Sequence, residues 1–458
     1  MKIAVASSGL GHIARGIETW ADDLGAALHR RGVDVTLFKG GGTATRPYEQ
    51  VLPCWQRGSR RAKWAVAIGK RFFWRYGFGS TYQVEQETFA RSLLRVLQRA
   101  EDRGHKSEVS NQRIEVSPQS SALNPHPPTF DLIHTQDPWL AYRLEQARRK
   151  GKHHAKVILA HGTEEPLEFL QQFEHVQELA PYYLEQDKRR LETLDFRPQT
   201  TDSFPLPLTP SPTAGWFAIP NFVDISRFSP DVAPLSRREL GIPENAFVIL
   251  CVSAIKRHHK RVDTVIDAVA RLRSQQSAVS NQPSIPISSL LPLTPFPIHL
   301  VIAGAREHET DSVIAYGKQQ LGSTVTFLPN FDRSKMPGLY RLADVMMHGS
   351  LMEMMPIALL EATASGLPVV AHNWPVIEWI VGDGGTCVDA TQPGAMASAL
   401  TPYLLPEFRA EKSAKARHRA VAMFSEEVVV EQIVEMYRVV SGKRQEESGR
   451  RKEQGGKR

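Results

Sequence analysis

Two carboxylates in the last third of the chain have a spacing that suits a hydroxyl-rich ligand. Glu353 and Glu361 are separated by seven residues, Pro356 stands where a helix would begin, and Gly366 stands where it would stop. We expect a loop, a helix and a buried strand, with one acid ahead of the helix and one inside it. Free N–H groups at a helix N-terminus suit a phosphate, and ionised acids accept hydrogen bonds from sugar hydroxyls. An ordinary amphipathic surface helix explains the same pattern.

A basic loop with the sequence IKRHHKR precedes a second predicted helix, at 262–272. Several positive charges at a helix N-terminus favour a diphosphate, and Lys260 lies closest to that terminus. The two histidines of the loop are adjacent, so their rings diverge, and they are a poor metal site. No D-x-D pair is present to hold Mg²⁺ on a diphosphate. Lys and Arg would then have to neutralise a leaving diphosphate, without a metal.

A glycine turn follows the first predicted strand. Gly9 and Gly11 with Ala14 satisfy the dinucleotide-binding pattern G-x-G-x-x-G/A. That pattern also requires an acid at the end of the second strand to hold a ribose, and Lys39 stands there instead. An NAD-binding oxidoreductase is therefore the minor alternative.

Length and composition indicate a globular protein of two domains. The chain has 458 residues, 41% of them hydrophobic and 23% charged, which is too long for a single core. No stretch is long and apolar enough to span a membrane, and residues 1–12 predict a first strand instead of a leader. The three cysteines are widely spaced, so we expect no disulfide framework or zinc site and a cytoplasmic location.

The net charge of +7 is local and does not indicate a nucleic-acid partner. Residues 441–458 form a basic tail that we expect to be disordered. Arg57–Tyr76 has no acid and is rich in aromatic residues, a mixture that suits peripheral contact with an anionic membrane at its inner face. A helix that packs its aromatic stripe inward explains these residues equally well.

Predicted strands and helices alternate through two successive halves, which indicates an α/β fold with two Rossmann-like domains and a ligand cleft between them. The strands fall at 2–6, 33–38, 131–134, 157–160, 217–220, 247–253, 299–303, 325–328 and 344–347, and a turn falls at 380–385. We expect an N-terminal domain, a C-terminal domain and a helix that returns to the first domain, at 1–219, 220–424 and 425–440. Segments rich in Ser, Pro, Gln and Asn predict low-complexity insertions, at about 104–128, 198–214 and 274–297.

Together these residues resemble the retaining glycosyltransferases of family 4, which have the GT-B fold. The strongest match is S-x-x-E-x7-E-A-x-A-x-G-x-P-V-V, in which Glu353 and Glu361 are the two acids. The supporting matches are weak singly and specific in their order and spacing: the Gly9 and Gly11 loop, His161-Gly162, residues 220–224, Lys260 with Asp263, and Asp344. The resemblance covers nearly the whole chain outside the predicted insertions and the tail.

The resemblance implies an enzyme that moves a sugar from a nucleotide-diphosphate sugar to a hydroxyl of a glycan, lipid or small molecule, as in polysaccharide or cell-envelope biosynthesis. The nucleotide-sugar is a co-substrate, and no further cofactor or metal is expected. The first domain would bind the acceptor and the second the donor. Such enzymes retain the configuration of the sugar, and the leaving phosphate oxygen helps to remove the proton of the acceptor.

The family's functional residues map onto individual positions of this chain. Glu353 would contact the hydroxyls of the donor sugar, Lys260 would neutralise the diphosphate, and His161 would line the acceptor side of the cleft. These three are the predicted catalytic residues. Glu361 would hold the ribose, and the remaining predicted donor contacts are Gly9, Gly11, Lys256, Arg257, Met354, Met355, Pro356 and Ile357.

Two positions depart from the family pattern. Ile255 replaces an arginine that family members place five residues before the lysine, and Lys256 or Arg257 is left to supply the charge. Met354 and Met355 stand where the family has glycines, which would reshape the donor-sugar pocket. A catalytically silent GT-B scaffold that binds a glycan or a partner is the second hypothesis, supported only by the missing arginine.

Overall fold

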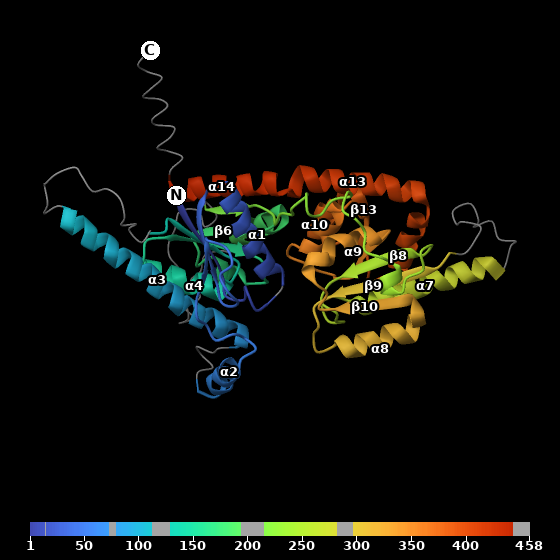
Figure 1. Cartoon of the computed structure of the whole chain (residues 1–458), viewed down its shortest axis with the longest axis horizontal. Helices are drawn as coiled ribbons and strands as arrows, with labels where there is room; N and C mark the ends of the chain where they lie inside the picture. Colours follow the sequence, from blue (N-terminus) through green and yellow to red (C-terminus); the bar gives the residue numbers. More distant parts are fainter. Residues whose placement is uncertain (14, 73–78, 112–128, 194–214, 282–295, 443–458) are drawn as a thin grey trace, which may run out of the picture. The chain divides into compact units, whose positions relative to one another are not determined.

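The structure is a computed structural model, and the chain divides in it into two compact units, Met1–Ile219 with Val430–Arg458, and Pro220–Val429 (Figure 1). The residues that it describes are 1–13, 15–72, 79–111, 129–193, 215–281, 296–442. The positions of the two units relative to one another are not determined, so each unit is described separately.

Unit 1 is built on a parallel sheet of seven strands in the order β3-β2-β1-β4-β5-β6-β7. The strands are β1 (Lys2–Ser7), β2 (Asp34–Lys39), β3 (Glu49–Val51), β4 (Leu132–Thr135), β5 (Lys156–His161), β6 (His175–Glu178) and β7 (Trp216–Ala218). Parallel neighbours need crossover connections, which helices provide. The carboxyl ends of β5 and β6 meet in register, with His161 opposite Glu178.

The helices of unit 1 cover this sheet. They are α1 (Gly16–Arg30), α2 (Arg60–Phe72), α3 (Thr81–Asn111), α4 (Pro138–Arg149), α5 (Leu167–Leu170), α6 (Pro181–Thr193) and the last helix, α14 (Glu426–Ser441), which belongs to unit 1 from Val430 onwards. The long helix α3 packs against both α2 and α4 (Figure 1). Buried Tyr437 of α14 hydrogen-bonds to buried His134 of β4 at 2.7 Å, which attaches the last helix to the central strands.

Unit 2 has a parallel sheet of six strands in the order β10-β9-β8-β11-β12-β13. The strands are β8 (Phe247–Val252), β9 (Ile298–Gly304), β10 (Val325–Pro329), β11 (Val345–His348), β12 (Val369–His372) and β13 (Gly385–Val388). The sequence of β8, FVILCV, is apolar throughout, and all but its last residue are buried. A continuous apolar run of this kind is typical of a parallel strand that helices cover on both faces.

The helices of unit 2 follow the strands in alternation. They are α7 (Val262–Asn281), α8 (Thr310–Leu321), α9 (Met336–Leu342), α10 (Ile357–Ala364), α11 (Pro375–Val381), α12 (Ala395–Leu400) and α13 (Pro406–Phe424). Short 3-10 turns lie at Arg238–Leu240, Gly322–Thr324, Arg333–Lys335, Gly382–Gly384 and Thr401–Leu404. Helices α7 and α8 pack side by side (Figure 1), and α7 contributes Val262, Val265 and Ile266 to the core cluster of this unit.

The predicted α/β class is confirmed, but three short strands, β3, β6 and β13, were not predicted, and the ends of several elements differ. Helix α7 continues to Asn281 and α3 to Asn111, so both helices extend into segments predicted as insertions. The predicted turn at 380–385 is instead the end of α11, a 3-10 turn and the start of β13. Helix α10 has eight residues, about two turns. Residues 112–128, 198–214, 282–295 and 443–458 of the predicted insertions and tail lie outside the described residues. Among the described residues, no helix is long and apolar enough to cross a membrane.

Candidate functional site

The two carboxylates at 353 and 361 lie around the start of α10, as the sequence predicts. Pro356 is the residue before the helix, and Gly366 beyond its end adopts a φ of +70°, which suits glycine. Glu353 lies in the preceding loop, and Glu361 lies inside the helix and is 3% exposed. The β11–α10 loop therefore carries one acid, and a helix packed into the domain carries the other.

Glu353 forms an ion pair with Lys260 from the basic loop, with Nζ 2.5 Å from Oε1. Buried His348, the last residue of β11, places Nε2 3.4 Å from the same oxygen. Burial alone would raise the pKa of Glu353, but His348 and Lys260 offset this and hold the pKa far below its usual range. The carboxylate is thus ionised at neutral pH, and its main partner is a flexible ammonium group that a ligand can displace.

The meeting of these two loops depends on Gly349, which follows His348. A Cβ built there lies 2.6 Å from the carbonyl oxygen of Arg261 and 3.0 Å from that of Lys260. The basic loop also contains two non-glycine residues with positive φ, His259 at 68° and Arg261 at 48°, a conformation that few side chains adopt. Close approach and a strained loop together bring Lys260 to Glu353.

Glu361 is enclosed by two residues that sequence reasoning missed. The Tyr340 hydroxyl donates a hydrogen bond to Oε2 at 2.8 Å, and an Arg333 guanidinium nitrogen lies 3.0 Å from Oε1. Burial, with the neighbouring Glu361 charge second, raises the pKa of Tyr340 well above its usual value. Tyr340 therefore stays a donor, and Arg333 supplies a cation from outside the predicted basic loop.

The other predicted donor contacts of unit 2 have different surroundings. The Lys256 ammonium lies 4.0 Å from Glu307, and Arg257 donates to Ser312 Oγ at 2.7 Å and lies over the Tyr316 ring. Ile255 is fully buried, so its side chain packs in the core of the domain. Among the predicted basic residues, Lys260 is the one that pairs with a predicted acid.

The segment between the two acids, residues 354–357, makes a backbone hydrogen bond and also packs partly into the core. Met355 is buried, and its carbonyl oxygen accepts a hydrogen bond from the Asn221 side chain at 3.3 Å. Met354 and Ile357 are half-buried, and Pro356 is buried. Because proline has no N–H, the helix begins with the backbone amide of Ile357.

In unit 1, the structure gives Gly9 and Gly11 a packing reason. Gly11 has a φ of +96°, and a Cβ on it lies 2.1 Å from the carbonyl oxygen of Gly41. A Cβ on Gly9 lies 2.1 Å from a Glu18 carboxylate oxygen and 2.5 Å from the Arg57 guanidinium. Both positions require glycine for packing within the unit itself, whatever ligand the loop binds. Ala14, the last residue of the dinucleotide pattern, lies outside the described residues.

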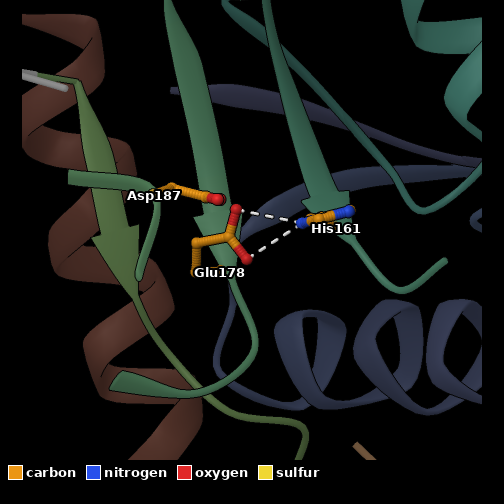
Figure 2. A group of neighbouring side chains, drawn as sticks. All are labelled: His161, Glu178 and Asp187. Atoms are coloured by element: carbon orange, nitrogen blue, oxygen red, sulfur yellow. Dashed lines mark hydrogen bonds and ion pairs between the residues drawn. The ribbon is translucent and has the colours of Figure 1, made fainter. Parts of the chain in front are cut away.

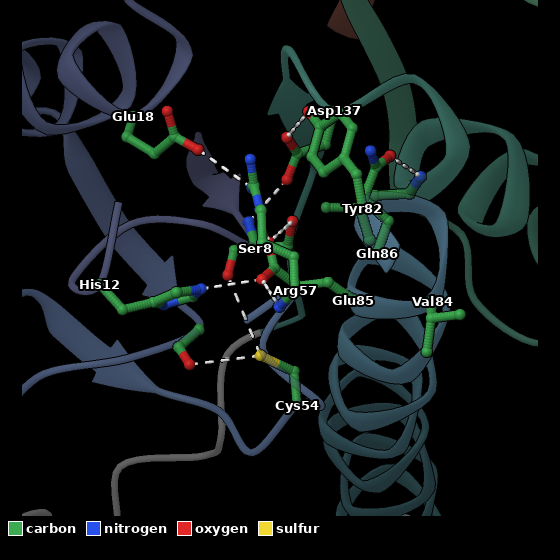
Figure 3. A network of polar contacts seen from close by, with 12 residues as sticks. Ser8, His12, Glu18, Cys54, Arg57, Tyr82, Val84, Glu85, Gln86 and Asp137 are labelled. Atoms are coloured by element: carbon green, nitrogen blue, oxygen red, sulfur yellow. Dashed lines mark hydrogen bonds and ion pairs between the residues drawn. The ribbon is translucent and has the colours of Figure 1, made fainter. Parts of the chain in front are cut away.

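A buried ion network lies beneath this glycine loop (Figure 3). Arg57 donates to Glu85 at 2.9 and 2.6 Å and to Glu18 at 3.1 Å, and its guanidinium lies 4.2 Å from the centre of the Tyr82 ring. Fully buried Glu85 also contacts His12 Nε2 at 2.8 Å. Although burial alone would raise the pKa of Glu85, hydrogen bonds from His12 and Arg57 lower it. Arg57, predicted as part of a membrane-facing basic stretch, therefore serves this network.

The carboxyl end of β5 carries the third predicted catalytic residue, His161 (Figure 2). Nδ1 of His161 lies 3.0 Å from both carboxylate oxygens of Glu178. Nε2 lies 3.6 Å from Glu165. Asp187 of α6 completes a buried group in which one donor atom from each of His161, Glu178 and Asp187 lies within 4.8 Å of the others. Glu178 and Asp187 have no family motif to identify them. Strand register places Glu178 opposite His161, and helix α6, which follows β6, carries Asp187.

Part of the chain matches a known protein family. Residues 233–421 match the family model described as glycosyl transferases group 1. The matched residues all lie within unit 2. The D-inositol 3-phosphate glycosyltransferase of Salinispora arenicola is 32% identical to this chain over 230 residues, which cover 47% of both chains. The enzyme of the same description from Arthrobacter sp. is 28% identical over 236 residues, which cover 49% of this chain and 52% of the relative. The chain spans about half the length of the curated relatives that it matches.

Solved structures match almost the whole chain at low identity. The sucrose-phosphate synthase from Thermosynechococcus elongatus has a TM-score of 0.64 and 17% identity and covers 96% of this chain and 98% of its own. The HepE protein of Anabaena in complex with UDP and glucose has a TM-score of 0.59 and 15% identity and covers 95% and 98%. At such identities the likeness shows the fold alone, which is that of two-domain α/β glycosyltransferases.

The buried ion network gives a stability prediction. Replacement of Glu85 by alanine leaves Arg57 and His12 without their shared carboxylate, and we expect the free energy of unfolding of unit 1 to fall by about 3–5 kcal/mol. Urea unfolding followed by tryptophan fluorescence measures this change. Arg95→Ala, on the exposed side of the same helix, is the control and should change it by less than about 0.5 kcal/mol. Equal effects of the two variants would contradict the assigned role of the network.

Proposed function

We propose that the protein is a retaining glycosyltransferase that moves a sugar from a nucleotide-diphosphate sugar to an acceptor hydroxyl, with no metal ion on the diphosphate. The observation that carries this proposal is the Lys260–Glu353 ion pair beside α10, with Glu361 inside the helix. A cation and a helix N-terminus are groups that bind a diphosphate, and two acids can accept hydrogen bonds from the hydroxyls of a sugar and a ribose. The group 1 domain that contains all of them supports the same activity.

In the proposed donor complex the Lys260–Glu353 pair exchanges partners. The Lys260 ammonium turns to the diphosphate, whose charge it neutralises, and Glu353 accepts hydrogen bonds from the sugar hydroxyls. His348 stays beside Glu353 and keeps a polar partner on the carboxylate while the lysine is away. The sugar hydroxyls replace the lysine while His348 remains, so the Glu353 carboxylate keeps polar partners throughout. Loss of all partners by an enclosed carboxylate would be costly.

Glu361 receives the ribose in this proposal. Tyr340 keeps its hydrogen bond to one carboxylate oxygen, and the other oxygen, which faces the partly exposed Arg333, accepts the ribose hydroxyls. Arg333 and Lys260 are then the two cations nearest the donor. Family members have an arginine at the position of Ile255, and Arg333 is a candidate to supply that charge. Lys256 and Arg257 are weaker candidates because they have other partners.

The transfer step itself needs no nucleophile from the protein. The acceptor oxygen forms a bond to the anomeric carbon on the face from which the phosphate oxygen leaves, and that phosphate oxygen takes the proton of the acceptor. Lys260 stabilises the charge that develops on the leaving diphosphate, and Glu353 fixes the sugar in a reactive orientation. We assign the acceptor, a glycan, lipid or small molecule, to unit 1. A solved structure of Anabaena HepE in complex with UDP-glucose, to which this chain is similar in fold, supports a nucleotide-sugar donor.

The ribose contact gives a binding prediction. We expect Glu361→Ala to raise the dissociation constant of the preferred nucleotide-sugar about 10- to 100-fold, because hydrogen bonds to a charged group contribute about 1.5–3 kcal/mol. Titration calorimetry with a panel of UDP-, GDP- and ADP-sugars measures this constant and identifies the donor. Glu378→Ala, an exposed acid in the same unit, is the control. Unchanged binding in Glu361→Ala would refute the site, and tight binding of NADH alone would favour the oxidoreductase.

We also propose that helix α2 contacts an anionic membrane surface. Trp64 is 65% exposed, and Arg60, Arg61 and Lys63 beside it are exposed as well. An exposed indole and three cations on one helix are suited to lipid headgroups. Ala62 is fully buried, so the opposite side of the helix start is fixed to the unit. Tyr76, at the end of the predicted basic stretch, lies outside the described residues.

Sedimentation with anionic vesicles tests this contact. We expect binding that falls steeply between about 0.05 and 0.3 M salt, because the screening length shortens to below 10 Å in this range. Neutralising Arg60, Arg61 and Lys63 together should remove the binding, since each contributes about 1 kcal/mol near such a surface. Neutralising Arg91, Arg95 and Arg99 of α3, which are also exposed, is the matched control. Vesicle binding that does not change with salt concentration would rule the contact out. An equal loss of binding in both triple variants would do the same.

A further inference from the structure

A buried group of acids surrounds His161 and has no place in the proposed transfer step. His161 ends β5, Glu178 ends β6, and Asp187 lies on α6 directly after β6. All three are buried, at 5%, 0% and 5% exposure. In Figure 2 the three side chains point toward one another from these elements. Buried charges of like sign are costly unless a cation accompanies them, so the protein must balance two acids here.

The ring of His161 supplies the balancing charge. The contact of Nδ1 with both oxygens of Glu178, at 3.0 Å each, requires a proton on Nδ1, because an ionised carboxylate is only an acceptor. Nε2 lies 3.6 Å from Glu165, so that a proton on this nitrogen too would be favoured. Burial acts to lower the pKa of His161, but Glu178, Glu165 and Asp187 together raise it above its usual value. These surroundings thus favour the imidazolium form of the ring over the neutral form.

Each charged group around this ring has an assigned effect. Glu178 from β6, Glu165 from the loop after β5 and Asp187 from α6 all favour the imidazolium. Burial and the Glu178 charge raise the pKa of Asp187 to about 6. Arg190 of α6 lies 3.7 Å from Asp187 and is largely exposed. The imidazolium is therefore the main buried cation among the groups that these residues face, and Glu178 is its nearest partner.

We propose that Glu178 is a positioning residue for the transfer reaction, which clamps His161 as an imidazolium and leaves Nε2–H to bind an oxygen of the substrate. The inference rests on the proposed function, because it concerns the role of His161 in the same reaction. The substrate oxygen is a sugar hydroxyl or a phosphate oxygen. His161 acts as a cationic hydrogen-bond donor in this arrangement and takes no proton from the acceptor, which agrees with proton transfer to the leaving phosphate oxygen. A charged donor forms stronger hydrogen bonds than a neutral one.

The contact between Nδ1 and Glu178 also argues for a proton in this group instead of a metal ion. A metal bound at Nδ1 would need that nitrogen deprotonated, and three nearby carboxylates oppose the loss of the proton. The spacing of the three donor atoms does not itself exclude a cation, so the experiment below contains a metal arm.

The first measurement follows His161 directly and needs no substrate. Histidine ring NMR signals in labelled protein, assigned by their loss in His161→Gln, give the pKa of His161 in the wild type and in Glu178→Gln. Glutamine can still accept a hydrogen bond from Nδ1–H but carries no charge, so we expect the pKa to fall by about one to three units. Glu164→Gln, an exposed acid in the neighbouring loop, is the matched control and should change it by less than about 0.3 units. An unchanged pKa in Glu178→Gln would overturn the clamp.

The second measurement is the pH profile of kcat/KM with the donor found in the sugar panel. Because the active form carries the proton, activity is present below the pKa of His161 and is lost as the pH rises through it. Glu178→Gln should move this alkaline limb to lower pH by the NMR shift and should regain near wild-type activity below the new limb. Glu178→Leu, which keeps neither charge nor acceptor, should be about tenfold or more slower at every pH. If Glu178→Gln lost activity equally at every pH and its alkaline limb did not move, the role of Glu178 would be merely structural. If activity were instead lost as the pH falls through the pKa of His161, the histidine would act as a general base. Either would overturn the proposal.

The metal arm uses the purified wild type with Zn²⁺ or Mn²⁺ alone. We expect neither ion to shift the His161 NMR signals or to restore activity after treatment with a chelator. A stoichiometric shift that Asp187→Asn abolishes would overturn the proton assignment. Failure of the proposed function gives a different result, namely no turnover with any nucleotide-sugar, and leaves the NMR comparison of the Glu178 variants fully interpretable.

Discussion

The ion pair between Lys260 and Glu353 is the interaction on which the proposed donor site depends. A carboxylate as enclosed as Glu353 is stable only with a cation or several donors beside it, and Lys260 and His348 provide these partners. Two unusual backbone features bring the lysine there: positive φ angles at His259 and Arg261, and the missing side chain at Gly349. The protein thus keeps a cation on the acid, in a position from which a diphosphate can attract it.

Similar pairings occur in both units, where three buried acids each have a basic partner from another element. Glu361 has Arg333, Glu85 has Arg57, and Glu178 has His161. Parallel sheets make this arrangement natural, because strands that are distant in the chain end at one edge and their following loops meet there. The acids that we assign to the donor have either a long, flexible lysine (Lys260) or a partly exposed arginine (Arg333) beside them. The more enclosed His161–Glu178 pair suits a fixed orientation, because both partners are held at strand ends.

Much of this could be predicted from sequence because it depends on local patterns. Apolar runs predicted most strands of both sheets but not the short strands β3, β6 and β13. The proline and glycine around α10 predicted the placement of Glu353 and Glu361. Helix ends were less predictable: α7 and α3 continue into polar segments that composition alone assigned to insertions. The partners were unpredictable for a different reason. Arg333, Tyr340, His348, Glu178 and Asp187 belong to none of the quoted motifs. Strand register brings Glu178 to His161, and the packing of other elements brings Arg333, Tyr340 and Asp187 to their partners. Arg57 shows the opposite error, since a basic stretch suggested a surface role for a residue that serves a buried network.

The central claim, that a diphosphate takes Lys260 from Glu353, is tested most directly by the affinity of the free nucleoside diphosphate for single variants of the pair. Titration calorimetry should be done on the wild type, Lys260→Met and Glu353→Gln with the diphosphate of the preferred donor. We predict weaker binding in Lys260→Met, because the diphosphate loses its cation, and tighter binding in Glu353→Gln, because the lysine no longer has an anionic competitor. Addition of the sugar should reverse the advantage of Glu353→Gln, since the sugar hydroxyls lose an ionised acceptor. Equal weakening of diphosphate binding in both variants would contradict the exchange of partners.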